Sequence, residues 1–216
     1  MAGLLHDLGK AIDAFQLRLR GKLEGRNLIR HEWVSLRLLE AFVGPDSDAA
    51  WLTRLADPSA EDDACWLTRL RCDGRDGDFE SPFKALQHAP LAAALGWLVV
   101  THHRLPALPR GGVFQMSSLR GLLTQVQPAW NEAAYEGAAP AAFEPYWRFS
   151  QGLPVTTQAW RQRAGRIARR LGEWQTRHTA DAAAALPLNN PFVMHLSRLS
   201  LMLADHHYSS LEGPST

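Results

Sequence analysis

The stretch from Leu91 to His103 most constrains the fold, because it is apolar on nearly every side of a helix. Pro90 stands before it, at a position where proline often begins helices. A helix with apolar residues all round is buried on most sides, so other elements must surround it. It ends in Thr101-His102-His103-Arg104, and two buried imidazoles need partners. Protonated histidines near the helix dipole are one explanation, and metal ligation is the other.

The rest of the chain is also predicted to be helical, because no stretch alternates apolar and polar residues as a half-buried strand does. With 216 residues, 46% of them hydrophobic, the chain has material for a substantial core. We expect a single all-α domain. The expected helices run to about residue 20, over 29–42, from a cap at 46 or 47, over about 60–70, over 90–103, from 117, in short pieces over 128–152, from a cap at 156 or 157 to about 178, and over 191–209. The aspartate-rich loop at 73–78 lacks the bidentate glutamate of an EF-hand and is interpreted as a solvated turn.

The charges and cysteines of the sequence bear on its binding partners and on its cellular compartment. The formal net charge of +1 gives no overall nucleic-acid signature. A local basic stripe on the 156–178 helix consists of Arg163, Arg166 and Arg170. It predicts either a solvated face or a surface that binds DNA backbone or an acidic partner. Cys65 and Cys72 have no recognisable metal spacing, which favours a reduced, cytoplasmic protein. No apolar run is long enough to predict a membrane span.

Several candidate metal ligands occur on different predicted helices. His6 and Asp7 bring a neutral nitrogen and an anionic oxygen to one place, which suits a borderline divalent metal. His31 lies on the inward face of its helix, although a hydrogen-bonded core histidine has the same pattern. Asp205 is on the buried side of the last helix, where a carboxylate without a cation is rare. Together with His102 and His103, these residues match the needs of two divalent cations about 4 Å apart that clamp a phosphate for hydrolysis.

The order H-D…H…H-H…D resembles the HD superfamily of metal-dependent phosphohydrolases. More narrowly, it is similar to the HD nuclease domain of the type I CRISPR interference helicase–nuclease, and to subtype I-F most. The resemblance covers almost the whole chain and rests on four sequences: Gly3-Leu-Leu-His-Asp-Leu-Gly-Lys10, Arg30-His-Glu-Trp-Val-Ser35, Thr101-His-His-Arg-Leu-Pro106 and Leu203-Ala-Asp-His-His-Tyr-Ser209.

The resemblance implies an HD-domain helical bundle that cleaves single-stranded DNA with two transition-metal ions (Mn, Fe, Co or Ni, with Mg possible). It implies that Asp7 bridges the ions and that Lys10 faces the substrate phosphate. It further implies that one ion is held by His31, His102 and His103, and the other by His6 and Asp205. His206 and His207 are expected not to be ligands. The partners implied are single-stranded DNA, a helicase domain in cis or in trans, the CRISPR surveillance complex and the adaptation proteins.

The sequence departs from this family in two ways. It has no G-x-x-x-x-G-K-[ST] motif, and only five residues precede His6, where family members usually supply a further metal-binding histidine. The abrupt start predicts that residues 1–216 are one HD nuclease domain excised from a longer protein. Two alternatives stay open: an HD phosphohydrolase acting on nucleotides or cyclic dinucleotides, and a non-catalytic docking module of a larger complex.

Overall fold

The computed structural model describes residues 1–77, 79–105, 123–130, 132, 135–177 and 190–211, and every regular element in these ranges is helical. The prediction of an all-α fold is confirmed. The helix expected from Ser117 lies outside the described residues. None of the described helices is long and apolar enough to cross a membrane. In chain order the elements are α1 (Ala2–Leu5), η1 (Leu8–Ala11), α2 (Asp13–Leu19), α3 (His31–Val43), α4 (Asp48–Ala56), α5 (Ala60–Thr68), α6 (Pro82–Ala85), η2 (Leu86–His88), α7 (Pro90–Thr101), η4 (Pro128–Trp130), η6 (Pro140–Tyr146), η7 (Pro154–Thr156), α9 (Gln158–Arg177) and α10 (Pro191–Ser210).

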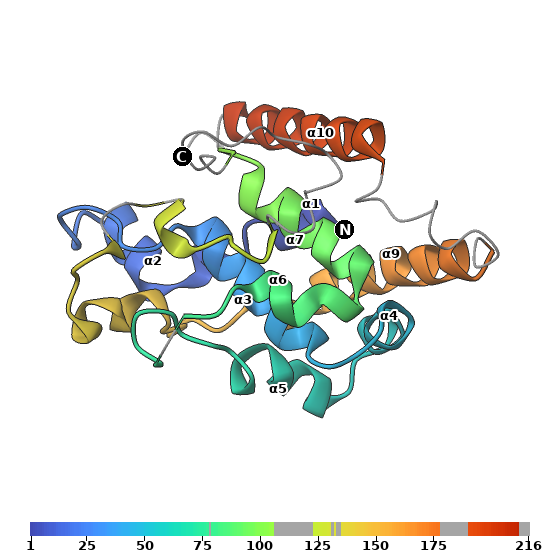
Figure 1. Ribbon diagram of the computed structural model, residues 1–216, viewed down its shortest axis with the longest axis horizontal. Helices are drawn as coiled ribbons and strands as arrows, with labels where there is room; N and C mark the ends of the chain where they lie inside the picture. The colour runs from blue at the N-terminus through green and yellow to red at the C-terminus, as the bar shows by residue number, and fades with distance from the viewer. Residues whose placement is uncertain (78, 106–122, 131, 133–134, 178–189, 212–216) are drawn as a thin grey trace.

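Helices α3 and α7 form the centre of the molecule, and the other helices cover them (Figure 1). The all-round apolar pattern of α7 is explained by this position, since nearly every residue from Leu91 to Thr101 is buried. The two helices lie close together at Gly96. A Cβ atom added there would lie 2.7 Å from Cδ1 of Leu36 and 3.3 Å from Cε1 of Phe83. The absence of a side chain at Gly96 therefore permits the approach that brings the C-terminal end of α7 beside α3.

The buried carboxylate of Asp48 joins α4 to the start of α7. It accepts hydrogen bonds from the backbone N–H groups of Leu91 (2.8 Å) and Ala92 (3.1 Å) and from Nε1 of Trp51 (2.8 Å). The first N–H groups of a helix have no intrahelical partner, and an anion there also interacts favourably with the helix dipole. Asp48 thus caps α7 from a neighbouring helix and fixes the position of α7.

The loop that begins at Asp73 is exposed at Arg75, Asp76 and Gly77, as the sequence suggested, but Asp73 itself is buried. Its carboxylate accepts hydrogen bonds from Nε (2.7 Å) and Nη2 (2.6 Å) of the buried Arg37 and from Nε1 of Trp33 (2.7 Å). The Arg37 guanidinium also donates to Glu40 at 2.7 Å. Sequence patterns did not reveal that Arg37 on α3 points inward and that Asp73 of the loop is its counter-ion.

The last two long helices pack against different parts of the molecule. Helix α9 packs against α4, where Gly165 allows close contact with the carbonyl oxygen of Ala56. Helix α10 lies across α1 and α7 (Figure 1). Met194 and Leu201 form its buried side, and Asp205 lies partly buried on that side, with 10% of its side chain exposed. The other predicted apolar stripe of α10 is exposed: Phe192, Leu196, Leu199 and Leu203.

Candidate metal centre

The chain from Gly3 to Lys10 does not form one helix, as the sequence suggested, but two short helical pieces. Helix α1 ends at Leu5 and η1 starts at Leu8, so His6 and Asp7 form the break between them. The buried Ser35 hydroxyl holds the break in place, because it donates to the His6 carbonyl (2.8 Å) and accepts from the Gly9 N–H (2.8 Å). Both polar backbone groups are thereby satisfied where helical hydrogen bonding is interrupted.

Gly9 is required at this break by its closeness to α3. A Cβ atom at Gly9 would lie 2.0 Å from the carbonyl oxygen of His31, a distance that no packing adjustment of a side chain can relieve. The glycine therefore lets the chain after Asp7 lie directly on the first turn of α3. This contact brings His31 beside Asp7.

The carboxylate of Asp7 lies between two histidines. Its Oδ1 is 3.3 Å from Nε2 of His31, and its Oδ2 is 3.3 Å from Nε2 of His6. Oδ2 also accepts a hydrogen bond from Nζ of Lys10 at 2.8 Å. Because its two oxygens face different imidazoles, Asp7 has the geometry of a carboxylate that bridges two cations.

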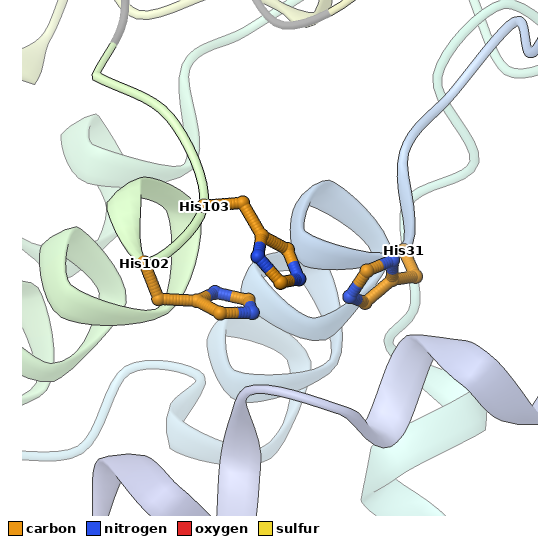
Figure 2. Close-up of side chains that lie close together, drawn as sticks. All are labelled: His31, His102 and His103. Carbon is orange, nitrogen blue, oxygen red and sulfur yellow. The ribbon is translucent and has the colours of Figure 1, made fainter. Parts of the chain in front are cut away.

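The end of α7 supplies two further imidazoles. His102 and His103 lie with their ring centroids 4.0 Å apart, and Figure 2 shows both rings directed toward His31 at the start of α3. Ligand atoms of His31, His102 and His103 all lie within 4.8 Å of one another, and so do those of His6, Asp7 and His102. His102 therefore lies between the two groups.

Helix α10 adds a second carboxylate to the cluster. Oδ1 of Asp205 is 3.5 Å from Nε2 of His6, and Oδ2 is 3.9 Å from Nδ1 of His103. The six candidate ligands, which come from the break after α1, the start of α3, the end of α7 and from α10, are therefore brought together, as the sequence predicted. His206 and His207 are exposed.

The donor atoms in this cluster fit a metal ion better than they fit one another. Four of them are buried without a hydrogen-bond partner among the described residues: Nε2 of His6, Oδ1 of Asp7, Nε2 of His31 and Nε2 of His102. Buried polar atoms are rarely left unsatisfied, and each such group costs about 1–3 kcal/mol. The Nδ1 atoms of His6 and His102 lie 3.0 Å and 2.6 Å from the carbonyl oxygens of Gly3 and Val99. Donation from Nδ1 to a carbonyl leaves Nε2 with a lone pair for a metal.

The charge states of the cluster favour metal binding. Burial acts to raise the pKa of Asp7, but contacts with His31 and Lys10 hold that pKa well below its usual range. Burial lowers the pKa of His102 to about 4, and it also lowers the pKa of His103. A carboxylate that stays ionised and imidazoles that stay neutral are the protonation states that metal ligands need.

Sequence reasoning missed Glu32, which is buried beside the centre. Its Oε2 is 3.3 Å from Nδ1 of His31, and its Oε1 is 3.3 Å from Nε of Arg30. A carboxylate behind a ligating histidine orients the ring and raises its basicity. The adjacent His31-Glu32 pair was the only sequence signal for this role. Ser35 was missed too. It lies on α3 but stabilises the break between α1 and η1, and no sequence pattern indicates such a role.

The cluster is open on one side. The side chains of Asp7, Lys10 and His103 are 35%, 34% and 32% exposed, whereas those of His6 and His31 are each 12% exposed. A molecule approaching from solvent therefore meets Lys10 and the Asp7 carboxylate first. The three arginines of the basic stripe, Arg163, Arg166 and Arg170, are exposed on α9.

Comparison with known proteins identifies relatives of the chain. No family model matches it. It is similar to the CRISPR-associated nuclease/helicase Cas3 subtype I-F/YPEST of Pseudomonas aeruginosa, with 45% identity over 217 residues, covering all of this chain and 19% of the relative. It is also similar to the protein of the same name from Pectobacterium atrosepticum, with 38% identity over 227 residues, covering 97% of this chain and 19% of the relative.

The chain thus spans about one fifth of the length of the curated relatives it matches. The matched part includes all four sequences on which the resemblance to subtype I-F rested. Over its full length the chain is similar to one region of the Cas3 subtype I-F/YPEST nuclease/helicases, which confirms the resemblance that the sequence indicated.

Proposed function

We propose that this chain is a metal-dependent nuclease domain that hydrolyses phosphodiester bonds of single-stranded DNA in CRISPR type I interference. The observation that carries the proposal is the convergence of unpartnered donor atoms from His6, Asp7, His31 and His102 in a relative of nuclease/helicases. An imidazole-rich set of donors suits Mn, Fe, Co or Ni better than Mg, which prefers oxygen ligands.

Two ions are proposed because Asp7 presents one oxygen to each side of the cluster. His31, His102 and His103 would hold one ion together with Asp7. His6 and Asp205 would hold the other, also with Asp7. When bound, the ions would supply Lewis-acid polarisation of the phosphate and would lower the pKa of a water molecule for attack on phosphorus.

The protein's own residues orient the substrate in this proposal. Lys10 has no lone pair for a metal when it is protonated, but its ammonium is half-exposed within 2.8 Å of Asp7. It is therefore positioned to contact a phosphate oxygen at the open side of the cluster.

The proposed partners follow from the family. Residues 1–216 would act as one domain of a longer cytoplasmic protein that carries its helicase in cis, and the surveillance complex and adaptation proteins would recruit that protein.

We assign the Arg163, Arg166 and Arg170 stripe to DNA backbone or an acidic partner. Charge reversal at two of these positions should weaken single-strand binding and flatten its dependence on salt. An unchanged salt slope would return the stripe to a solvated face.

The test of the proposed function compares three classes of substrate. Purified protein with Mn is incubated with a labelled single-stranded oligonucleotide, with deoxynucleoside triphosphates and with cyclic dinucleotides. We expect turnover of the oligonucleotide that is abolished by EDTA. Turnover of nucleotides or cyclic dinucleotides alone would establish a phosphohydrolase instead. A protein that binds no metal and turns over none of them would be a docking module.

A further inference from the structure

A pocket of about 270 Å³ adjoins the metal centre on the side of His31. Its other lining residues include Phe15 and Arg18 of α2, Arg30 before α3, Glu132 and Tyr146. His31 belongs both to this pocket and to the cluster of ligands. A molecule in the pocket would therefore lie next to whatever the metal centre holds.

Within this pocket, Arg18 has hydrogen-bond donors that the fold does not use. Its Nη1 donates to the carbonyl oxygen of Gly25 at 2.8 Å, but its Nε and Nη2 are buried without a partner among the described residues. A buried guanidinium with unused donors is costly, and it is the group that recognises phosphate by paired hydrogen bonds. The two unused donors indicate that an anion completes this site.

Aromatic rings form another part of the pocket. The Phe15 ring contacts the His31 ring edge to face, with centroids 5.7 Å apart. Tyr146 also lines the pocket, and its hydroxyl accepts a hydrogen bond from the Leu28 N–H at 3.1 Å, which fixes the ring. Aromatic side chains next to a cationic group are the usual combination for single-stranded nucleic acid, because every base has a face on which to stack.

The charge of the pocket agrees with an anionic ligand. Two guanidinium groups line it, from Arg18 and Arg30, against one carboxylate, from Glu132. Arg30 is already paired with Glu32 at 3.3 Å, so Arg18 is the cation with donors to spare.

We infer that this pocket binds one nucleotide of the DNA strand, directly beside the phosphate held at the metal centre. Arg18 binds the phosphate of that nucleotide and Phe15 packs against its base. The inference rests on the proposed function and adds a subsite to it. The volume of about 270 Å³ lies just below the range of small-molecule pockets, which is roughly 300–1,000 Å³. The pocket is therefore suited to a single nucleotide rather than a cyclic dinucleotide.

The test compares two substrates in the same protein with Mn. A single-stranded oligonucleotide reports strand binding and hydrolysis together, whereas bis(p-nitrophenyl) phosphate reports hydrolysis at the metal centre without a strand. The measured quantity is the ratio of kcat/KM for the oligonucleotide to kcat/KM for bis(p-nitrophenyl) phosphate. Arg18→Gln should lower this ratio about tenfold and reduce the slope of log binding constant against log salt by about 0.7, the value for one phosphate contact on a single strand.

Arg20→Gln is the matched control, because Arg20 is exposed just beyond the end of the same helix. It should keep the wild-type ratio. Phe15→Leu tests the aromatic part independently and should lower the ratio by a factor of at least five, as expected when a base loses its stacking partner.

Four outcomes would overturn the inference, and the last of them would also overturn the proposed function. An Arg18→Gln ratio equal to that of wild type, in protein that cleaves the oligonucleotide, shows that the pocket binds no strand. An equal fall in Arg20→Gln shows a general charge effect. Inhibition by thymidine monophosphate with a Ki below the KM of the oligonucleotide assigns the pocket to free nucleotides. If wild-type protein hydrolyses only the small phosphodiester, the proposed function itself is wrong, and the inference fails with it.

Discussion

Nε2 of His31 lies 3.3 Å from Oδ1 of Asp7, and no hydrogen-bond partner among the described residues satisfies either atom. The other oxygen of Asp7 faces His6 at the same distance. This arrangement depends on Gly9, whose missing side chain lets the break between α1 and η1 lie against the carbonyl of His31. The close approach of Gly9 to the His31 carbonyl therefore supports the contact between Asp7 and His31.

Lys10 should contribute to turnover without contributing to metal affinity. Lys10→Ala is expected to lower kcat for single-stranded DNA by about 10²-fold, the usual effect of removing one charged donor from a transition state. Metal content per protein, measured by elemental analysis after dialysis, should stay at the wild-type value. Lys84→Ala, at an exposed position on α6, is the control and should change neither quantity. Metal loss as large as that in His6→Ala would show that the role of Lys10 is misassigned.

Ser35 should matter for stability because its hydroxyl satisfies two backbone groups. In Ser35→Ala, the His6 carbonyl and the Gly9 N–H lose their partner inside the protein. Each unsatisfied buried group costs about 1–3 kcal/mol, so we expect the free energy of unfolding to fall by about 2–4 kcal/mol. Urea denaturation of metal-free protein measures this change.

Ser200→Ala is the matched control for Ser35→Ala, because the Ser200 hydroxyl is exposed and bonds only within α10. It should change the free energy of unfolding by less than about 0.5 kcal/mol. Equal stability of the two variants would mean that the helix break does not depend on Ser35.

Cys72 should be unreactive over the ordinary pH range. Burial raises the pKa of its thiol to about 12, and the thiolate is the form that reacts with alkylating agents. At pH 8 iodoacetamide should therefore modify Cys72 at least tenfold more slowly in folded protein than in urea, as followed by peptide mass spectrometry. Cys65 is more exposed and serves as the internal comparison. Rapid labelling of Cys72 in folded protein at pH 8 would contradict its buried placement.

Much of the fold was predictable because helical periodicity and capping residues act locally. Pro90 begins α7 and Ser47 caps α4 as expected, and the apolar pattern of α7 correctly indicated a central helix. The set of candidate ligands was also predictable, since histidines and carboxylates at inward positions of buried helices need a shared explanation.

The missed features depend on contacts between distant parts of the chain. The break at His6 and Asp7 is held by Ser35, whose hydroxyl comes from another helix. Asp73 is buried only because Arg37 points inward from α3. Periodicity within one segment contains no information about such partners, so the sequence suggested one continuous helix and gave no sign that Asp73 is buried.

The most direct test of the metal-dependent nuclease is a titration of Mn into protein stripped with EDTA, with cleavage of a single-stranded oligonucleotide measured at each step. Wild-type protein should be inactive without metal and should gain activity well beyond one equivalent of Mn, because both proposed ions act together and the centre with fewer imidazoles binds more weakly. Asp7→Asn should stay inactive at every Mn concentration, since its loss weakens both centres. Cleavage by stripped wild-type protein in excess EDTA, or wild-type activity in Asp7→Asn, would contradict this account.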